Sequence, residues 1–168
     1  MITFDFKDGN GPVPAHKHPN GGGWVADTAT VAKTAYVGFD AKVFDNAQVS
    51  GEALVYGDAR VYGDAKVSDN ARVCSDAQVF DSAWVYGNAK VYGDAKVFDD
   101  ARVYGDARVY GDARVSGGAV VYGDARLSDH TWVYGNARVF DNARVSNDAE
   151  EDMFIEMNGK RYKLVEVE

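Results

Sequence analysis

Aliphatic residues recur at every sixth position along most of this chain. Between residues 25 and 145 that position holds valine in all of the 21 hexapeptides except one, where Leu127 replaces it. Four residues after each of these positions comes an alanine, from residue 29 to residue 149, with Thr131 as the one exception. A period of six does not match the 3.6-residue turn of an α-helix, so the pattern excludes helices from this region.

Each hexapeptide combines a short strand with a bend. In Arg60-Val61-Tyr62 the valine points to one side and its neighbours to the other, as the alternation of a β-strand requires. Gly-Asp, Asp-Asn or Gly-Asn then follows, and these residues tolerate the positive φ of tight turns. Three such sides close a triangular coil of 18 residues. Residues 25–150 therefore predict an all-β column of about seven stacked coils.

An aliphatic first residue followed by a small fifth residue resembles the hexapeptide repeat of left-handed parallel β-helices. The resemblance covers about three quarters of the chain and implies a left-handed prism that forms a homotrimer. More narrowly, the chain is similar to phage and bacterial transferase-hexapeptide-like proteins, which open with a segment like Gly11-Pro-Val-Pro-Ala-His-Lys-His-Pro-Asn-Gly-Gly-Gly-Trp. It departs from the family at the second repeat position, which is mostly Tyr or Phe here.

The two ends of the chain lie outside the repeat. Residues 1–24 contain all three prolines, and they predict a short strand over residues 3–6 followed by a capping loop. Residues 151–168 contain two β-like runs around Asn158-Gly159, a pair typical of hairpin turns. Because a stack of repeats leaves its end coils uncovered, we expect an N-terminal capping loop and a C-terminal β-hairpin.

Charge and composition narrow the possible partners and location. The net charge of −8 disfavours non-specific binding to nucleic acid or to an anionic membrane surface. The chain has no run of the roughly 20 apolar residues that cross a bilayer, and it does not open with a secretory signal pattern. Its single cysteine, Cys74, excludes an intramolecular disulfide. We therefore expect a cytoplasmic protein.

Basic and aromatic side chains are predicted to line the outside of the prism. Of the 13 Lys and Arg residues between positions 25 and 150, 12 directly precede the key aliphatic position, and aromatic residues often follow it. The simplest interpretation is that stacked rows protect the sheets. A second is that Arg102, Tyr104, Arg108 and Tyr110 bind a small anionic, nucleotide-like ligand between subunits. A third is subunit contact through the least polar face, around Trp84.

His130 is the one histidine inside the repeat. Acyltransferases of the resembled fold use a prism histidine as general base and bind acyl-CoA between subunits. The resemblance thus implies an alternative function, O- or N-acyl transfer with His130 as base and acetyl-CoA as cosubstrate. The simpler interpretation is that His130 is a turn residue, since the repeat contains no inserted loop.

His16 and His18 have a strand-type spacing that could direct both rings at one metal ion. A third ligand, such as Asp8 or a residue of a neighbouring subunit, would be needed, so we favour a capping loop and expect no resident metal or cofactor. Taken together, the sequence favours a non-enzymatic, trimeric binding or assembly protein of phage type that acts on a host factor or sequesters a small anion.

Overall fold

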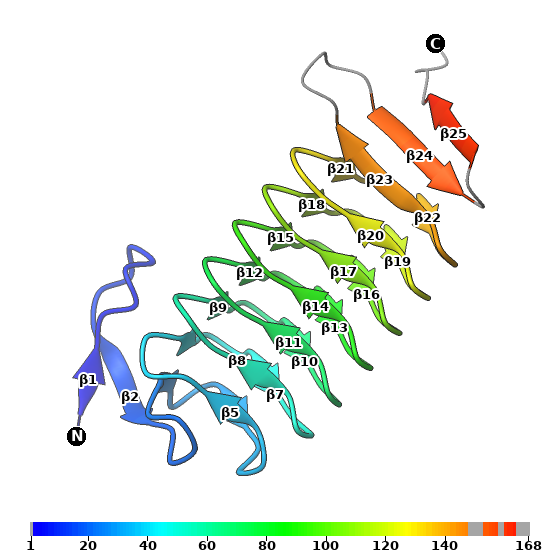
Figure 1. Ribbon diagram of the computed structural model, residues 1–168. Coiled ribbons are helices and arrows are strands. Elements are labelled where there is room, and N and C mark those ends of the chain that lie inside the picture. Colours follow the sequence, from blue (N-terminus) through cyan, green and yellow to red (C-terminus); the bar gives the residue numbers. More distant parts are fainter. Residues whose placement is uncertain (1, 148–152, 158–159, 164–168) are drawn as a thin grey trace.

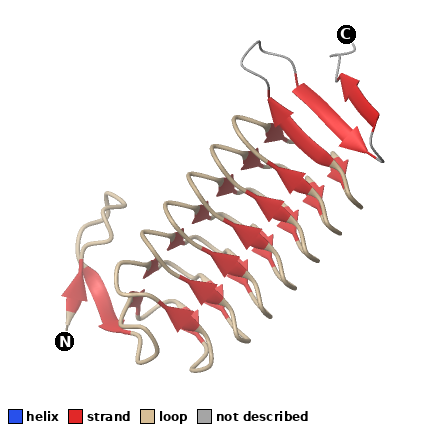
Figure 2. Ribbon diagram, viewed as in Figure 1, coloured by secondary structure: helices blue, strands red, loops and turns tan. Residues whose placement is uncertain are grey.

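The computed structural model describes residues 2–147, 153–157 and 160–163. It is an elongated column of stacked triangular coils, with β1 (Thr3–Phe4) and β2 (Val13–Lys17) at one end and β24 (Met153–Met157) and β25 (Lys160–Lys163) at the other (Figure 1). Every regular element in the described residues is a β-strand (Figure 2). This confirms the prediction of an all-β parallel solenoid of about seven coils.

No helix in the part of the chain that the structure describes is long and apolar enough to cross a membrane.

Successive strands belong to different sheets, so each sheet gains one strand per coil. The first sheet consists of β1 (Thr3–Phe4), β2 (Val13–Lys17), β3 (Trp24–Ala26), β6 (Lys42–Val43), β9 (Arg60–Val61), β12 (Gln78–Val79), β15 (Lys96–Val97), β18 (Arg114–Val115) and β21 (Trp132–Val133). The second consists of β4 (Thr30–Val31), β7 (Gln48–Val49), β10 (Lys66–Val67), β13 (Trp84–Val85), β16 (Arg102–Val103), β19 (Val120–Val121) and β22 (Arg138–Val139). The third consists of β5 (Tyr36–Val37), β8 (Leu54–Val55), β11 (Arg72–Val73), β14 (Lys90–Val91), β17 (Arg108–Val109), β20 (Arg126–Leu127), β23 (Arg144–Asn147), β24 (Met153–Met157) and β25 (Lys160–Lys163).

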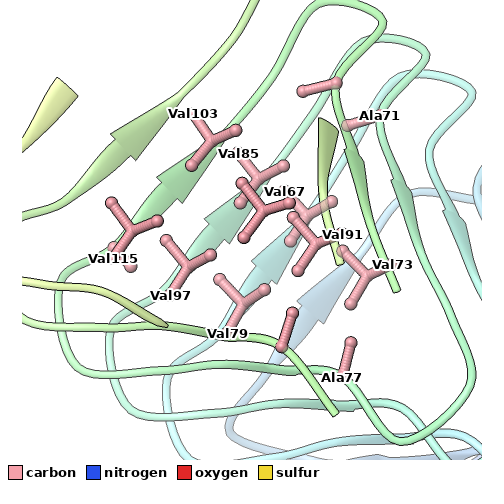
Figure 3. Close-up of a cluster of buried hydrophobic side chains, with 14 of the residues drawn as sticks. Val67, Ala71, Val73, Ala77, Val79, Val85, Val91, Val97, Val103 and Val115 are labelled. Carbon is pink, nitrogen blue, oxygen red and sulfur yellow. The ribbon is translucent and has the colours of Figure 1, made fainter. Parts of the chain in front are cut away.

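The register between coils follows the hexapeptide period. Val79 pairs in parallel with Val61 on one side and with Val97 on the other. Figure 3 shows how the valines of the three sheets meet inside the column, one coil above the next. The interior positions are inaccessible to solvent, as at Val61 and Ala65, which are both 0% exposed. The backbone ladder and the apolar core therefore share one register.

Leu127 and Thr131, the two exceptions to the repeat, are also fully buried. Leu127 occupies the valine column without difficulty because it is aliphatic. Thr131 brings a hydroxyl into the alanine column, and its Oγ1 has no hydrogen-bond partner in the described part of the chain. A buried polar atom without a partner is destabilising, so Thr131 makes this coil less stable than the alanine of the repeat would.

The corners of the prism depend on a left-handed backbone conformation. From Asp45 to Asp141, the second residue after each key aliphatic position has a positive φ, and it is glycine, aspartate or, once, Ser75. Four of these aspartates, Asp45, Asp69, Asp81 and Asp99, make a further contact, because their carboxylates accept a hydrogen bond from a main-chain amide of the next coil. Asp69 Oδ2 accepts a hydrogen bond from the Gly87 amide at 3.0 Å, and Asp99 Oδ2 accepts one from the Gly117 amide at 2.9 Å.

The N-terminal cap contains more regular structure than the predicted loop. β2 lies within the proline-containing segment and pairs antiparallel with both β1 and β3, so it covers the open edge of the first sheet. The fully buried Phe6 stacks on Phe44, with ring centroids 4.9 Å apart. Gly23 donates its amide to the Val37 carbonyl at 2.9 Å. A Cβ at Gly23 would collide with the Gly38 carbonyl, which explains the glycine there.

At the C-terminal end the third sheet changes from parallel to antiparallel pairing. β23 pairs antiparallel with β24, and β24 pairs antiparallel with β25. The predicted Asn158-Gly159 turn lies outside the described residues, as does the predicted boundary at residues 150 and 151. The antiparallel strands continue the third sheet beyond β21 and β22, the last strands of the other two sheets.

Candidate functional site

The longest continuous row of basic side chains lies on the third sheet. Five successive strands place a basic side chain before the buried residue, in parallel register with one another; we call this row the basic ladder, and it consists of Arg72, Lys90, Arg108, Arg126 and Arg144. The equivalent row of the first sheet is interrupted by Gln78, and that of the second sheet by Trp84 and Val120.

The basic ladder has no carboxylate partner among the side chains that the structure describes. None of these carboxylates lies within 4.0 Å of its five basic groups. Neighbouring cations are separated by one strand spacing, about 4.8 Å, and like charges at this distance repel one another. An anion on this surface would reduce that repulsion.

A short stack of tyrosine rings runs beside the basic ladder. The Tyr92 and Tyr110 centroids are 5.0 Å apart, and the rings are inclined by only 4°. Burial raises the pKa of Tyr92, while the nearby Arg108 and Arg126 guanidiniums act in the opposite direction. In the next coil Ser128 takes the place of a ring. Among the described residues, Tyr92 is the one ring stacked on Tyr110, so no second described ring covers the other face of the half-buried Tyr110.

The four residues predicted to bind an anion divide into two pairs on different sheets. Arg108 lies on the third sheet and Tyr110 directly follows its strand. Arg102 and Tyr104 hold the same positions on the second sheet. The Tyr104 ring is stacked between Tyr86 at 4.8 Å and Tyr122 at 5.1 Å, so both of its faces are occupied. The sequence analysis did not select Arg126, although its spacing of 18 residues from Arg108 is the signal that places it in the same row.

His130 lies at the corner between the third and first sheets. Its Nε2 is 3.4 Å from Asp112 Oδ2, and its side chain is 78% exposed. The Asp112 carboxylate is positioned to orient the imidazole ring, which is the arrangement a general base uses. The exposed position leaves the ring fully solvated, as expected of a turn residue.

His16 and His18 have separate partners in the N-terminal cap. His16 Nδ1 is 2.8 Å from Asp27 Oδ1 on an exposed surface. His18 is buried, and its Nε2 is 3.0 Å from the Ala35 carbonyl oxygen. No group of three or more His, Cys, Asp or Glu side chains within the described ranges is arranged to hold a metal ion. Both rings tie the cap to the coils that follow it.

Comparison with known proteins identifies the repeat. Residues 47–63, 107–123 and 132–147 match the model of the YdcK beta solenoid repeat, and all three segments belong to the stacked coils. The chain is a β-solenoid repeat protein of the hexapeptide-repeat type. No curated protein matches the solenoid.

One solved structure that resembles the solenoid is that of a Bacillus cereus protein described as a candidate acetyltransferase. The match covers 86% of this chain and 77% of the Bacillus protein, with 11% sequence identity and a TM-score of 0.31. A likeness at this level says nothing about activity. The left-handed winding, the phage origin and the cytoplasmic location stay predictions.

Proposed function

We propose that the solenoid is a non-enzymatic binding and assembly protein that holds a small anionic, nucleotide-like ligand against its third sheet. The observation that carries this proposal is that Tyr110, beside the basic ladder, is stacked on a ring on one face only among the described residues. Phosphate oxygens would accept charge-assisted hydrogen bonds from Arg108 and Arg126. The base would stack on Tyr110 in the space that Ser128 leaves open.

The surroundings of the basic ladder favour a small ligand over a long polyanion. Asp106 and Asp124 line the corner on one side of the third sheet, and Asp94 and Asp112 line the corner on the other side. With a net charge of −8 for the whole chain, an extended nucleic acid would meet repulsion along both corners. A mononucleotide can contact two guanidiniums and one ring without reaching either corner.

We also propose that the solenoid associates as a homotrimer through its second sheet. Trp84 and Phe140 there are 39% and 37% exposed, and exposed aromatic side chains are typical of subunit interfaces. The second and third sheets share the corner at Gly105, so a neighbouring subunit would end beside the ligand. Sedimentation analysis should find a trimer that Trp84→Lys dissociates, while Trp132→Lys on the first sheet leaves it intact. A monomeric wild-type chain would refute this part.

Titration calorimetry with ADP and with pyrophosphate tests the ligand site. Arg108→Gln together with Arg126→Gln should weaken binding of both by about tenfold or more, since two charge-assisted hydrogen bonds are lost. Tyr110→Ser should weaken the binding of ADP and leave the binding of pyrophosphate almost unchanged, because only ADP has a base that can stack. Arg102→Gln, on the second sheet, is the matched control. Absence of binding at millimolar concentrations of both compounds would refute the proposal.

The His130–Asp112 pair supports a second candidate function, acyl transfer from acetyl-CoA. If the solenoid is not an enzyme, acetyl-CoA should neither raise its melting temperature nor be hydrolysed by it. Thermal stabilisation together with hydrolysis that His130→Ala abolishes would favour the acyltransferase instead.

A further inference from the structure

The first sheet carries a groove that the proposed anion site does not use. It has a volume of about 510 Å³ and extends over four coils, from β9 to β18. One wall is a column of corner carboxylates and the other a column of strand side chains; they are Asp58, Asp76, Asp94 and Asp112 on one side and Arg60, Gln78, Lys96 and Arg114 on the other. All eight lining residues are polar, unlike those of an ordinary apolar pocket.

The polar groups of this groove do not pair with one another. Among the described residues, no groove carboxylate lies within 4.0 Å of a basic groove side chain. Gln78 accepts a hydrogen bond from the Tyr62 hydroxyl at 3.3 Å through Oε1, so its amide Nε2 remains a donor. Acceptors on one wall thus face donors on the other across a space that a ligand could fill.

The backbone of the groove floor leaves no room for a ligand that adds as a strand. The main-chain N–H of Gln78 donates to the Ala95 carbonyl at 2.9 Å, and β12 pairs with β9 and β15 on its two sides. An extended peptide recognised through its main chain needs a free sheet edge. Recognition here must therefore go through the side chains.

The charge of the groove disfavours a simple ion. Four carboxylates stand opposite two arginines and one lysine, so neither a phosphate nor a metal cation meets a surface of one sign. A hydroxyl group both donates and accepts hydrogen bonds, and it can bridge a carboxylate and a guanidinium in the same coil. Because the pattern repeats with every coil, the best match is a chain whose units each present several hydroxyls.

An aromatic side chain stands one coil beyond the groove, in register with its donor column. The carboxylate column continues to His130 and the donor column to Trp132 in the next coil. Trp132 is 47% exposed, and its Nε1 donates to Ser116 Oγ at 2.9 Å, which fixes the indole. An exposed and oriented indole offers a rigid apolar surface with little entropy cost on binding, and the C–H face of a sugar ring fits such a surface.

We propose that the groove between the carboxylate column and the donor column of the first sheet binds a neutral oligosaccharide that lies along the column axis. Its hydroxyls bridge the two walls, and one terminal sugar ring packs on Trp132. The two sites flank the same corner, which carries Asp94 and Asp112, but no residue proposed to bind the nucleotide is proposed to bind the oligosaccharide.

Maltohexaose, cellohexaose and chitohexaose, three neutral hexasaccharides with different linkages, are the probes. Calorimetry should show saturable binding of at least one of them, with Trp132→Phe removing the accompanying change in tryptophan fluorescence. The corresponding disaccharide should bind at least about tenfold more weakly, because it contacts fewer coils. Asp76→Asn with Asp94→Asn should weaken hexasaccharide binding about tenfold, since two strong acceptors are lost.

The matched control is Asp106→Asn with Asp124→Asn, at the same turn position of another corner, which should leave hexasaccharide binding unchanged. ADP binding should be the same in both double variants, so failure of one site is distinguishable from failure of the other. The proposal is overturned if no hexasaccharide binds at millimolar concentration, or if binding is insensitive to Asp76→Asn with Asp94→Asn. It is also overturned if Ca²⁺ or a peptide of alternating Lys and Glu binds the groove in place of the sugars.

Discussion

The corner residue with positive φ is where a single side chain has most influence on the coil. Glycine adopts this conformation without steric cost, and aspartate is among the few other residues that tolerate it. Asp99, with a φ of 56°, also accepts a hydrogen bond from the next coil. Aspartate at this position thus combines a tolerated conformation with a contact that glycine cannot make.

Replacing Asp99 separates these two contributions. Asp99→Ala should destabilise the solenoid by about 1–2 kcal/mol, because it adds backbone strain and removes the hydrogen bond to Gly117. Asp99→Gly should cost less, because only the hydrogen bond is lost. Asp100→Ala, one residue on and exposed, should change stability by less than about 0.5 kcal/mol. Urea denaturation measures all three, and equal effects of Asp99→Ala and Asp100→Ala would contradict this account.

At the scale of the element, the ring columns reinforce the backbone ladder. On the first sheet Phe44, Tyr62, Phe80 and Phe98 stack with successive centroids 4.8–5.0 Å apart. This distance equals the spacing of neighbouring strands, so the pairing that forms the sheet also brings the rings into contact. The expectation that outer rows stabilise the sheets agrees with this geometry.

A ring inside the column, stacked on both faces, should therefore contribute more to stability than an isolated ring. Phe80→Ala removes two ring contacts at once and should lower the free energy of unfolding by about 1–3 kcal/mol. Phe39, which is 70% exposed, provides the comparison, and Phe39→Ala should have a clearly smaller effect. Thermal and urea unfolding of the two variants decide the matter; a similar loss in both would show that ring stacking contributes little.

For the whole molecule, stability should depend on pH through the stacked tyrosines. Burial raises the pKa of Tyr62, Tyr86 and Tyr92 above the usual value of 10.0. The folded state therefore retains phenol protons that the unfolded chain gives up. Their stabilising contribution is complete below pH 10 and disappears as the pH rises through the higher pKa values of the folded state.

The midpoint of urea unfolding should accordingly fall as the pH rises above about 10. Tyr62→Phe should reduce the slope of this fall, because a buried titrating group is removed. Tyr134→Phe serves as the control, because Tyr134 is 55% exposed. An unfolding midpoint that is flat with pH in the wild type, or a slope unaffected by Tyr62→Phe, would contradict this prediction.

Sequence analysis predicted the repeated part of the fold more completely than its cap or its site. The strict period specified the parallel register, whereas β2 was missed because its strand depends on pairing with β3 across the end of the column. The residues expected to bind an anion were chosen by type. Ring stacking then separated Tyr104, which stacks with a ring on each face, from Tyr110, which stacks with one described ring.

The amino-acid sequence by itself determined the three-sided coil, because a buried residue at every sixth position and a turn-former after it repeat one short strand and one bend on each side. Which outer side chains act together was decided by the tertiary structure. Residues 18 apart become neighbours only after the coils stack, and whether a ring face or a charged group stays available depends on what the adjacent coil places beside it.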